Sequence, residues 1–195
     1  MALPDHNQLT EAEYLTFEDD ADTKHEYAAG QVIAMTGASW AHNVIGVNVS
    51  SQLHSQLIGK TCTVTANDLR LKVEAEVSYR YPDVMAVCGE PSFIKGRTDT
   101  ITNPTLIVEI LSKTTAFIDH NTKLDEYTQI PTLQAYLLID QTQAKLIRYL
   151  RQGAQDWLYT AFTGLDAHVQ LPFIGCELRL ADVYENITLN GDSTP

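Results

Sequence analysis

The chain has 195 residues, 44% of them hydrophobic and 19% charged, and this length suits one large domain with a substantial apolar core. Such hydrophobic content excludes an intrinsically disordered protein. The formal net charge of −12 opposes binding of nucleic acid through its phosphates, although residues 1–30 alone hold eight acidic residues against one basic residue, Lys24.

Signals for export or for membrane insertion are missing from the sequence. No apolar run reaches the roughly 20 residues of a membrane span, and residues 1–14 lack the basic start and apolar run of a signal peptide. The three cysteines, Cys62, Cys88 and Cys176, lie far apart and match no zinc or redox spacing, so we interpret them as buried thiols. We therefore expect a single cytoplasmic domain over residues 1–195 with no membrane segment.

The first predicted element is a short helix in the acidic N-terminal segment, residues 1–24. Thr10 and Glu13 have the spacing of a capping box, which predicts that a helix begins there. We expect it to end near Phe17, because the acidic run at residues 18–22 has little that it can bury.

A strand over residues 31–35 and a long helix over residues 41–58 come next. The helix is predicted because its apolar residues recur every four positions, as on one face of an amphipathic helix, and Gly59 ends it. These apolar residues are Ile45, Val49, Leu53 and Leu57.

The rest of the chain is dominated by short strand-like segments. Residues 82–88 and 106–111 are almost continuously apolar, as strands buried on both faces are, and we place them at the centre of the sheet. A helix is predicted over residues 119–130, which Pro131 stops. The other predicted elements are strands over 61–66, 69–73, 135–140, 145–151 and 157–162, a helical segment over 180–184 and a frayed tail over 188–195.

Two acidic residues, Asp83 and Glu109, interrupt the central strands. A carboxylate in a buried strand is costly unless it is paired or binds a metal. Mg²⁺ prefers oxygen ligands and takes one or two protein carboxylates together with waters and substrate phosphates. The pair is therefore predicted to bind a divalent metal that could polarise a phosphodiester.

Each of these residues also has a simpler interpretation. Asp83 follows Pro82 at the start of its strand and could bond a turn, and Glu109 could point outward from an edge strand. The same stretch of chain offers basic residues that could form a local rim for an acidic substrate. They are Arg70, Lys72, Arg80, Lys95, Arg97 and Lys113.

A longer series of residues accompanies the two carboxylates. It runs Glu26, His42, Pro82-Asp83, Val108-Glu109-Ile110-Leu111-Ser112, Thr114-Thr115, Asp119, Lys123, Tyr127. From about residue 9 to residue 150 this order resembles the Uma-type restriction endonucleases of bacteria, a branch of the PD-(D/E)xK nuclease superfamily. The resemblance implies a restriction-endonuclease-like fold, a mixed sheet flanked by helices. It also implies Mg²⁺ or Mn²⁺ as cofactor, DNA as substrate and a homodimer.

By position, the resemblance assigns the metal to Asp83 and Glu109 and makes Glu26 the additional acid of the site. One departure concerns the lysine that the superfamily places two residues after the glutamate, where this chain has Leu111. The resemblance moves this role to Lys123 on the following helix, where it could orient the attacking water or stabilise charge on the phosphate.

Other interpretations of the helix remain open. Asp119, Lys123 and Tyr127 are spaced four apart on one helical face, which fits an exposed ion pair above a packed tyrosine as well as a catalytic face. His42 could face the site or simply occupy the end of its helix.

We therefore carry three hypotheses for the function. The first is a Mg²⁺-dependent endonuclease that uses Asp83, Glu109, Lys123 and Glu26. The second is a nuclease fold that acts as a binding or regulatory module with little catalysis, which the acidic composition and the displaced lysine would suit. The third is a hydrolase of small phosphodiesters, against which the absence of a glycine-rich phosphate loop counts.

Overall fold

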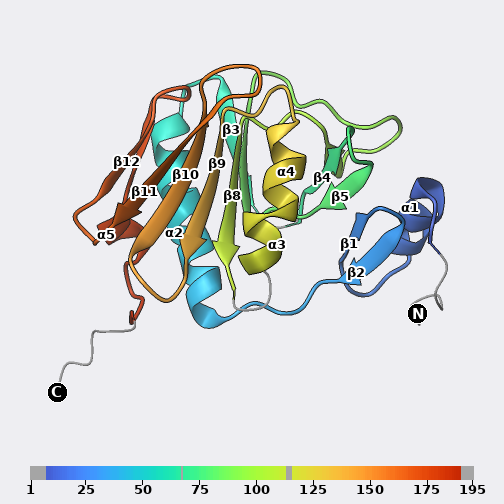
Figure 1. Ribbon diagram of the computed structural model, residues 1–195, viewed down its shortest axis with the longest axis horizontal. Helices are drawn as coiled ribbons and strands as arrows, with labels where there is room; N and C mark the ends of the chain where they lie inside the picture. The colour runs from blue at the N-terminus through green and yellow to red at the C-terminus, as the bar shows by residue number, and fades with distance from the viewer. Residues whose placement is uncertain (1–7, 67, 113–115, 190–195) are drawn as a thin grey trace.

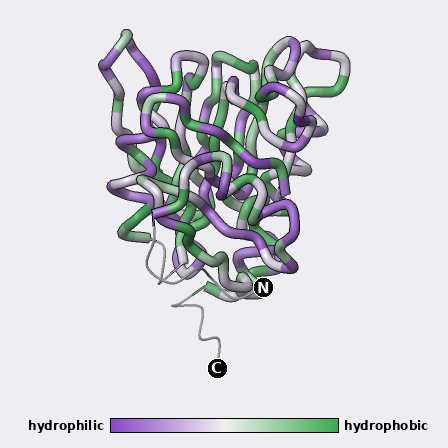
Figure 2. The backbone as a smooth tube through the Cα atoms, turned by 90° about the vertical axis from the view of Figure 1, so that its right-hand side faces the viewer, coloured by the Kyte–Doolittle hydropathy of each residue, from purple (hydrophilic) through white to green (hydrophobic). Residues whose placement is uncertain are grey.

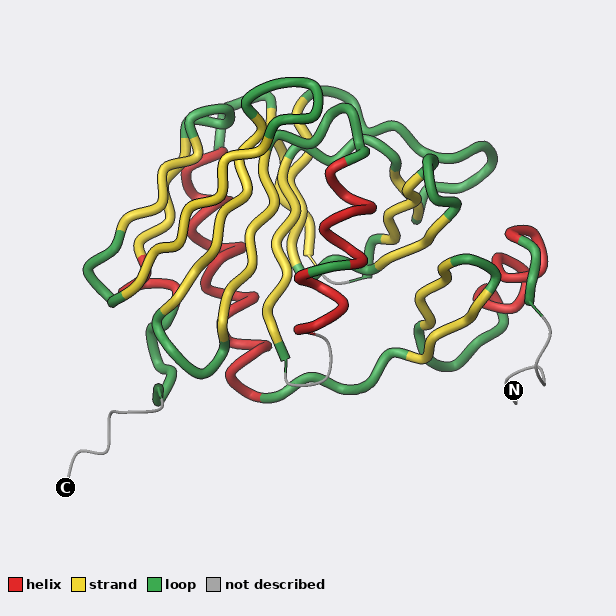
Figure 3. Tube along the Cα trace, in the orientation of Figure 1, coloured by secondary structure: helices red, strands yellow, loops and turns green. Residues whose placement is uncertain are grey.

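The computed structural model describes residues 8–66, 68–112 and 116–189, and the positions Lys113, Thr114, Thr115 and 190–195 lie outside this part of the chain. Helices pack on mixed β-sheets, which confirms the expected α/β class (Figures 1 and 3). The helices are α1 (Glu11–Asp19), α2 (Trp40–Leu57), α3 (Ala116–His120), α4 (Thr122–Thr128) and α5 (Leu180–Val183). The strands are β1 (His25–Ala28), β2 (Gln31–Ala34), β3 (Cys62–Ala66), β4 (Arg70–Val73), β5 (Ser78–Arg80), β6 (Val84–Cys88), β7 (Thr100–Ile101), β8 (Leu106–Leu111), β9 (Ala135–Asp140), β10 (Lys145–Arg151), β11 (Trp157–Thr163), β12 (His168–Leu171) and β13 (Cys176–Arg179).

The main layer is a six-stranded sheet in the order β11-β10-β9-β8-β6-β3. Strands β8 and β9 run parallel and their neighbours are antiparallel, so the sheet is mixed as expected. Helix α2 lies on one face of this sheet, and α3 and α4 lie on the other (Figure 1). The two nearly continuous apolar segments are β6 and β8, adjacent in the interior of the sheet, as their burial on both faces requires.

Helix α2 follows its apolar pattern closely. Its buried residues are the four predicted from the spacing, and they pack against the even-numbered residues of β8, such as Val108. Ser39 caps the helix by accepting a hydrogen bond from the backbone N–H of His42. Figure 2 shows the resulting hydrophobic stretches of backbone passing through the middle of the molecule.

Among the helices of the described residues, none combines the length and the apolar character that crossing a membrane requires.

A second, five-stranded sheet has the order β2-β1-β5-β4-β7, and several of its strands were not predicted. The β1–β2 hairpin turns at Ala29 and Gly30, both with positive φ, as a two-residue turn of this kind requires. Three tyrosines, Tyr14, Tyr27 and Tyr79, form a buried aromatic cluster between this sheet and α1. These short strands carry little periodicity, so composition alone did not distinguish them from loops.

The predicted end of the first helix near Phe17 was wrong, because the acidic run does bury a residue. The capping box of Thr10 and Glu13 is present, but α1 continues to Asp19. Glu18 is buried and accepts hydrogen bonds from the backbone N–H of His25 and from the hydroxyl of Tyr81. Paired in this way, its carboxylate can leave water without the usual penalty.

The helix predicted over residues 119–130 is divided into α3 and α4. Asn121 separates the two, and its side chain donates a hydrogen bond to the carbonyl of Phe117. An asparagine side chain that bonds nearby backbone in this way competes with helix continuation.

The interpretation of all three cysteines as thiols was wrong for two of them. Cys62 and Cys88 lie opposite each other on the neighbouring strands β3 and β6 and form a disulfide. Their separation of 26 residues concealed a pairing that the strand register creates. Cys176 is a free, buried thiol as expected.

Candidate functional site

The register of β6 and β8 brings the two predicted metal carboxylates together. Val84 pairs with Val108 in this antiparallel ladder, so the preceding Asp83 lies opposite Glu109. Residues directly opposite in such a pair point to the same face, with Cβ atoms about 5 Å apart. That face is the one covered by α4, because Ile107 of the same strand face packs in the cluster that contains Tyr127.

Glu109 is buried in an interior strand, which excludes an outward-facing position on an edge strand. Glu109 is only 4% exposed. Its Oε1 accepts a hydrogen bond from Lys123 Nζ at 3.0 Å and another from the Tyr127 hydroxyl at 2.9 Å. Helix α4 therefore fixes the carboxylate from above the sheet.

Asp83 connects the sheet to the first turn of α2. Its Oδ2 accepts a hydrogen bond of 2.7 Å from the backbone N–H of Ile110 and lies 3.2 Å from Nε2 of His42. Burial lowers the pKa of His42, but the hydrogen bond to Asp83 and the charge of that carboxylate outweigh it and raise the pKa above its usual value. His42 thus occupies a helix end and also faces the site.

Lys123 lies among three carboxylates. Its Nζ is 3.0 Å from Glu109 Oε1, 3.1 Å from Asp119 Oδ1 and 3.2 Å from Glu26 Oε1. Burial lowers the pKa of Lys123, but the carboxylates outweigh burial and raise it, so the ammonium is charged. All four residues are buried, which rules out the exposed Asp119–Lys123 pair.

Two further residues complete this network: Arg80, which the sequence placed in a basic rim, and Glu126, which it did not single out. Arg80 of β5 is 1% exposed and binds both carboxylate oxygens of Glu126, at 2.8 and 2.6 Å. Its remaining Nη1 donates to Glu26 Oε2 at 2.9 Å. No sequence signal marked this pair, because Arg80 and Glu126 are 46 residues apart and lie on different elements.

Glu26 and Glu109, the two strand residues whose carboxylates bind Lys123, have pKa shifts in opposite directions. Burial raises the pKa of Glu26, but the charges of Lys123 and Arg80 outweigh it and lower the pKa below its usual value. Burial raises the pKa of Glu109 to about 8, Lys123 opposes this rise, and the charge of Asp83 adds to it. Such divergence between neighbouring acids is typical of functional sites, although buried structural ion networks also produce it.

The donor set of the network fits a divalent cation. Five carboxylates face two permanent cations, so the cluster holds more negative than positive charge. Asp119 Oδ1 is buried and, although it is close to the ammonium of Lys123, receives no well-directed hydrogen bond from the described residues. The five carboxylates are those of Glu26, Asp83, Glu109, Asp119 and Glu126, and the cations are Arg80 and Lys123.

Within the described part of the chain, no three side chains of His, Cys, Asp or Glu are arranged to enclose an ion. Mg²⁺ takes only one or two protein carboxylates, with waters and substrate oxygens in the other positions, so a site of two carboxylates would not form such a group. Asp83 and Glu109, opposite each other and of this chemistry, are the residues suited to that role.

Four of the six residues proposed for a basic rim are buried or already paired with carboxylates. Arg80 is buried, Arg70 is buried and binds Asp99, and Lys72 and Arg97 are each paired with two carboxylates. These side chains are already engaged in ion pairs with carboxylates, so they offer little positive charge to phosphates. Lys95 is exposed, and Lys113 lies outside the described residues.

Comparison with known proteins shows where this architecture recurs. Residues 11–181 match the Uma2 family, which is described as "Putative restriction endonuclease", and this confirms the resemblance drawn from the sequence. Two uncharacterized proteins of Synechocystis sp. are 39% identical over 166 residues (85% of this chain, 94% of the relative) and 34% identical over 180 residues (92% and 93%).

A solved structure from Anabaena variabilis, described as "a putative nuclease belonging to DUF820", superposes with a TM-score of 0.71. It is 20% identical in sequence, and the match covers 91% of this chain and 98% of the other. The likeness confirms the expected restriction-endonuclease-like arrangement of a mixed sheet between helices.

Proposed function

This chain belongs to the Uma2 family, and from that premise we propose that it is a divalent-metal-dependent endonuclease that hydrolyses phosphodiester bonds in DNA. The observation that carries the proposal is the pairing of Asp83 and Glu109 across β6 and β8, beside a buried lysine, in a cluster with excess negative charge. Such a cluster has little value for stability, because buried charges are retained at a cost.

In this proposal Asp83 and Glu109 hold Mg²⁺ or Mn²⁺. When bound, the ion would polarise the phosphodiester, lower the pKa of a water and stabilise the leaving oxygen. Tyr127 and Lys123 bind one oxygen of Glu109 and fix the carboxylate, and the backbone N–H of Ile110 fixes Asp83. Orientation of both ligands is thus set before substrate arrives.

Lys123 is the residue we propose to stabilise charge on the phosphate. Its ammonium is permanently charged and sits in a water-poor environment, where its field is stronger than in solvent. Glu26 supports this role, because it binds Lys123 with one oxygen and Arg80 with the other. We propose that Glu26 positions the lysine, a narrower role than completing the metal shell. A homodimer, with one site for each DNA strand, belongs to the same proposal.

The test is cleavage of supercoiled plasmid and of single-stranded DNA with Mg²⁺ or Mn²⁺. Asp83→Ala and Glu109→Ala are expected to abolish cleavage, and chelation of the metal should do the same. Asp68→Ala is the matched control, because Asp68 is an exposed acid whose ion-pair partner is Lys24 and not a residue of the candidate site. Equal activity in all variants, or activity without metal, would overturn the proposal.

Calorimetric titration with Mn²⁺ separates the other hypotheses. Metal binding that disappears in Glu109→Ala, without cleavage of any DNA, would support a binding module. Turnover of a generic small phosphodiester, with no cleavage of DNA, would support a small-substrate hydrolase.

A further inference from the structure

The sheet face that carries Glu109 extends beyond α4 onto strands that no described helix covers. The ladders align Glu109 of β8 with Leu138 of β9, Ile147 of β10 and Ala161 of β11, all on this face. Figures 1 and 3 show α4 beside β8, on its right, and no helix in front of β10 and β11. Leu138 and Ile147 are buried and Ala161 is exposed, so the exposed part of this face lies at β11, and buried side chains separate it from Glu109.

A row of tyrosines crosses this face, two residues along each strand from the row that contains Leu138 and Ile147. Ring centroids are 5.2 Å apart from Tyr127 to Tyr136, 6.2 Å from Tyr136 to Tyr149, and 5.6 Å from Tyr149 to Tyr159. The row begins at the Tyr127 hydroxyl bonded to Glu109 and ends at Tyr159, which is 53% exposed. Aromatic rings thus lead from the carboxylates to solvent.

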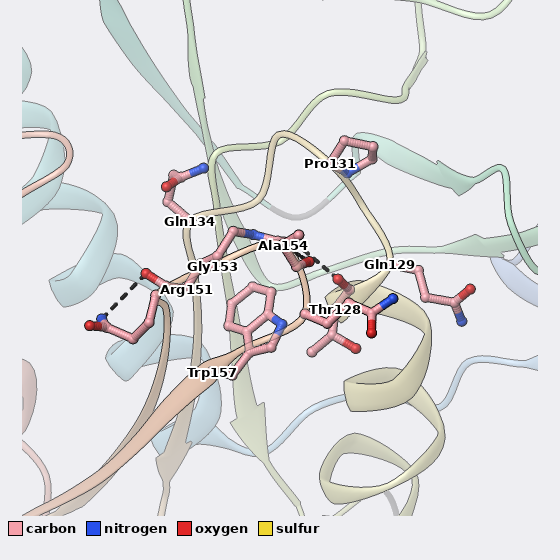
Figure 4. Close-up of a pocket in the computed structure, with 10 residues that line it drawn as sticks. Thr128, Gln129, Pro131, Gln134, Arg151, Gly153, Ala154 and Trp157 are labelled. Atoms are coloured by element: carbon pink, nitrogen blue, oxygen red, sulfur yellow. Dashed lines mark hydrogen bonds between the residues drawn. The ribbon is translucent and has the colours of Figure 1, made fainter.

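The next row ends in a pocket. Arg151 of β10 pairs with Trp157 of β11, and its guanidinium lies 4.3 Å from the indole centroid. The Arg151 donors bind the carbonyls of Thr128, Ile130, Leu133 and Ala154, which joins the segment after α4 to the β10–β11 turn. Between them is a cavity of about 760 Å³, shown in Figure 4.

The chemistry of this pocket suits a flat ligand with hydrogen-bonding edges. Its lining includes the indole of Trp157 and four carboxamides, which can both donate and accept hydrogen bonds. In a chain of net charge −12, no acidic side chain of the described residues lines it, and Arg151 contributes a positive charge. The carboxamides belong to Gln129, Gln134, Gln152 and Gln155.

We propose that the aromatic strip, defined as Tyr149, Tyr159 and Trp157, with the adjoining pocket, binds unpaired nucleobases of a DNA strand that enters the site. This inference rests on the proposed nuclease function. Arg70, Lys72 and Arg97 are paired with carboxylates and offer little charge to phosphates, so we expect the bases to supply much of the affinity. Aromatic side chains stack on bases regardless of sequence, and glutamine amides match base edges.

A second copy of this chain is the other candidate occupant. The exposed apolar area on this face is confined to a few side chains around Tyr159, whereas a stable dimer buries about 800 Å² on each partner. The polar pocket lies on the same sheet face as Glu109, and its lining favours a polar ligand.

The test measures binding of a fluorescent oligodeoxythymidylate by anisotropy in EDTA, where metal-dependent cleavage cannot interfere. Tyr159→Ala and Trp157→Ala are each expected to weaken binding by about 5- to 100-fold, the effect of losing one stacked base. Tyr159→Phe keeps the ring and should keep the affinity. The matched control is Leu158→Ala, since Leu158 is similarly exposed, at 47%, on the opposite face of the same strand.

Two further probes isolate the role of the bases. An abasic oligonucleotide of equal length and charge should bind the wild-type protein no more tightly than the base-containing oligonucleotide binds the Tyr159→Ala variant. Affinity for the base-containing strand should fall only shallowly with salt, because few phosphates are neutralised.

The proposal is overturned if wild type binds no oligonucleotide, if the abasic strand binds equally well, or if Tyr159→Ala and Leu158→Ala behave alike. It is also overturned if Tyr159→Ala dissociates a dimer in sedimentation while DNA affinity is unchanged. Binding is measured without metal, so the binding result does not depend on whether the protein cleaves DNA. A strand bound through Tyr159 but never cut would refute the nuclease proposal alone.

Discussion

Replacing Glu109 with glutamine should remove the part of the pH dependence of folding stability that this residue causes. In the metal-free protein, burial raises the pKa of Glu109 to about 8 from a usual value near 4.5, so its carboxyl binds a proton in the folded chain that the unfolded chain has released. An acid whose folded pKa is raised makes the protein less stable as pH rises between the two values. The neutral amide introduced by Glu109→Gln would imitate the protonated form and remove this dependence.

The size of the effect follows from one proton. Linkage allows at most about 1.4 kcal/mol per pH unit, so from about pH 5.5 to pH 7.5 wild type should lose up to about 3 kcal/mol relative to Glu109→Gln. Urea denaturation across this range, in EDTA, measures the difference. Parallel profiles for the two proteins would refute the reasoning, since they would mean that Glu109 is ionised throughout. Added Mn²⁺ should stabilise wild type and leave Glu109→Gln unchanged.

Three further changes test the surroundings of the site. Arg80→Met leaves Glu26 and Glu126 buried without their cation, and should lower the free energy of unfolding by about 3–5 kcal/mol in urea. Adding Glu126→Gln to that variant should recover part of the loss, and a simple sum of the two single effects would contradict the network. Replacing both Cys62 and Cys88 with serine opens a link across 26 residues and should lower the free energy of unfolding in urea by about 3 kcal/mol. Hydrogen bonding from Arg97 holds the pKa of Asp99 well below its usual value, so its stabilisation is present above about pH 4 and is lost as pH falls further. Asp99→Asn should flatten the acid side of the stability profile measured by circular dichroism.

The elements that sequence predicted best are those with strong periodicity or continuous apolar runs. Strand β8 and the strands β9 and β10 have their predicted bounds, and α2 is displaced by one residue. The strands that were missed are short and mix polar with apolar residues. Neighbouring elements hold such strands in place, so their own sequence gives little signal. They are β1, β5, β7, β12 and β13. Pairing of Cys62 with Cys88 likewise depends on a register that spacing along the chain does not reveal.

For the site, the sequence identified Asp83 and Glu109 as acids in buried strands, and the family resemblance added Lys123 and Glu26, but the pairing of Arg80 with Glu126 was not predicted. A lone acid within an apolar strand marked Glu109, and Asp83 followed from the adjacent strand. Arg80 and Glu126 carry opposite charges in polar surroundings, where nothing distinguishes a buried pair from an exposed one. Their partnership joins β5 to α4 and becomes visible only when the two sheets are assembled.

The network around Lys123 spans both sheets, and this has a consequence for cooperativity. Glu26 and Arg80 come from the five-stranded sheet, whereas Glu109 lies in the six-stranded sheet. Proteins open locally in units that are less stable than the whole, and we expect the smaller sheet, which has its own small tyrosine cluster, to be such a unit. An opening there would remove two partners of the ionic network while β6 and β8 stayed paired. Activity would then disappear on heating before the main sheet melts, and hydrogen exchange in β1 and β5 would report the competence of the site.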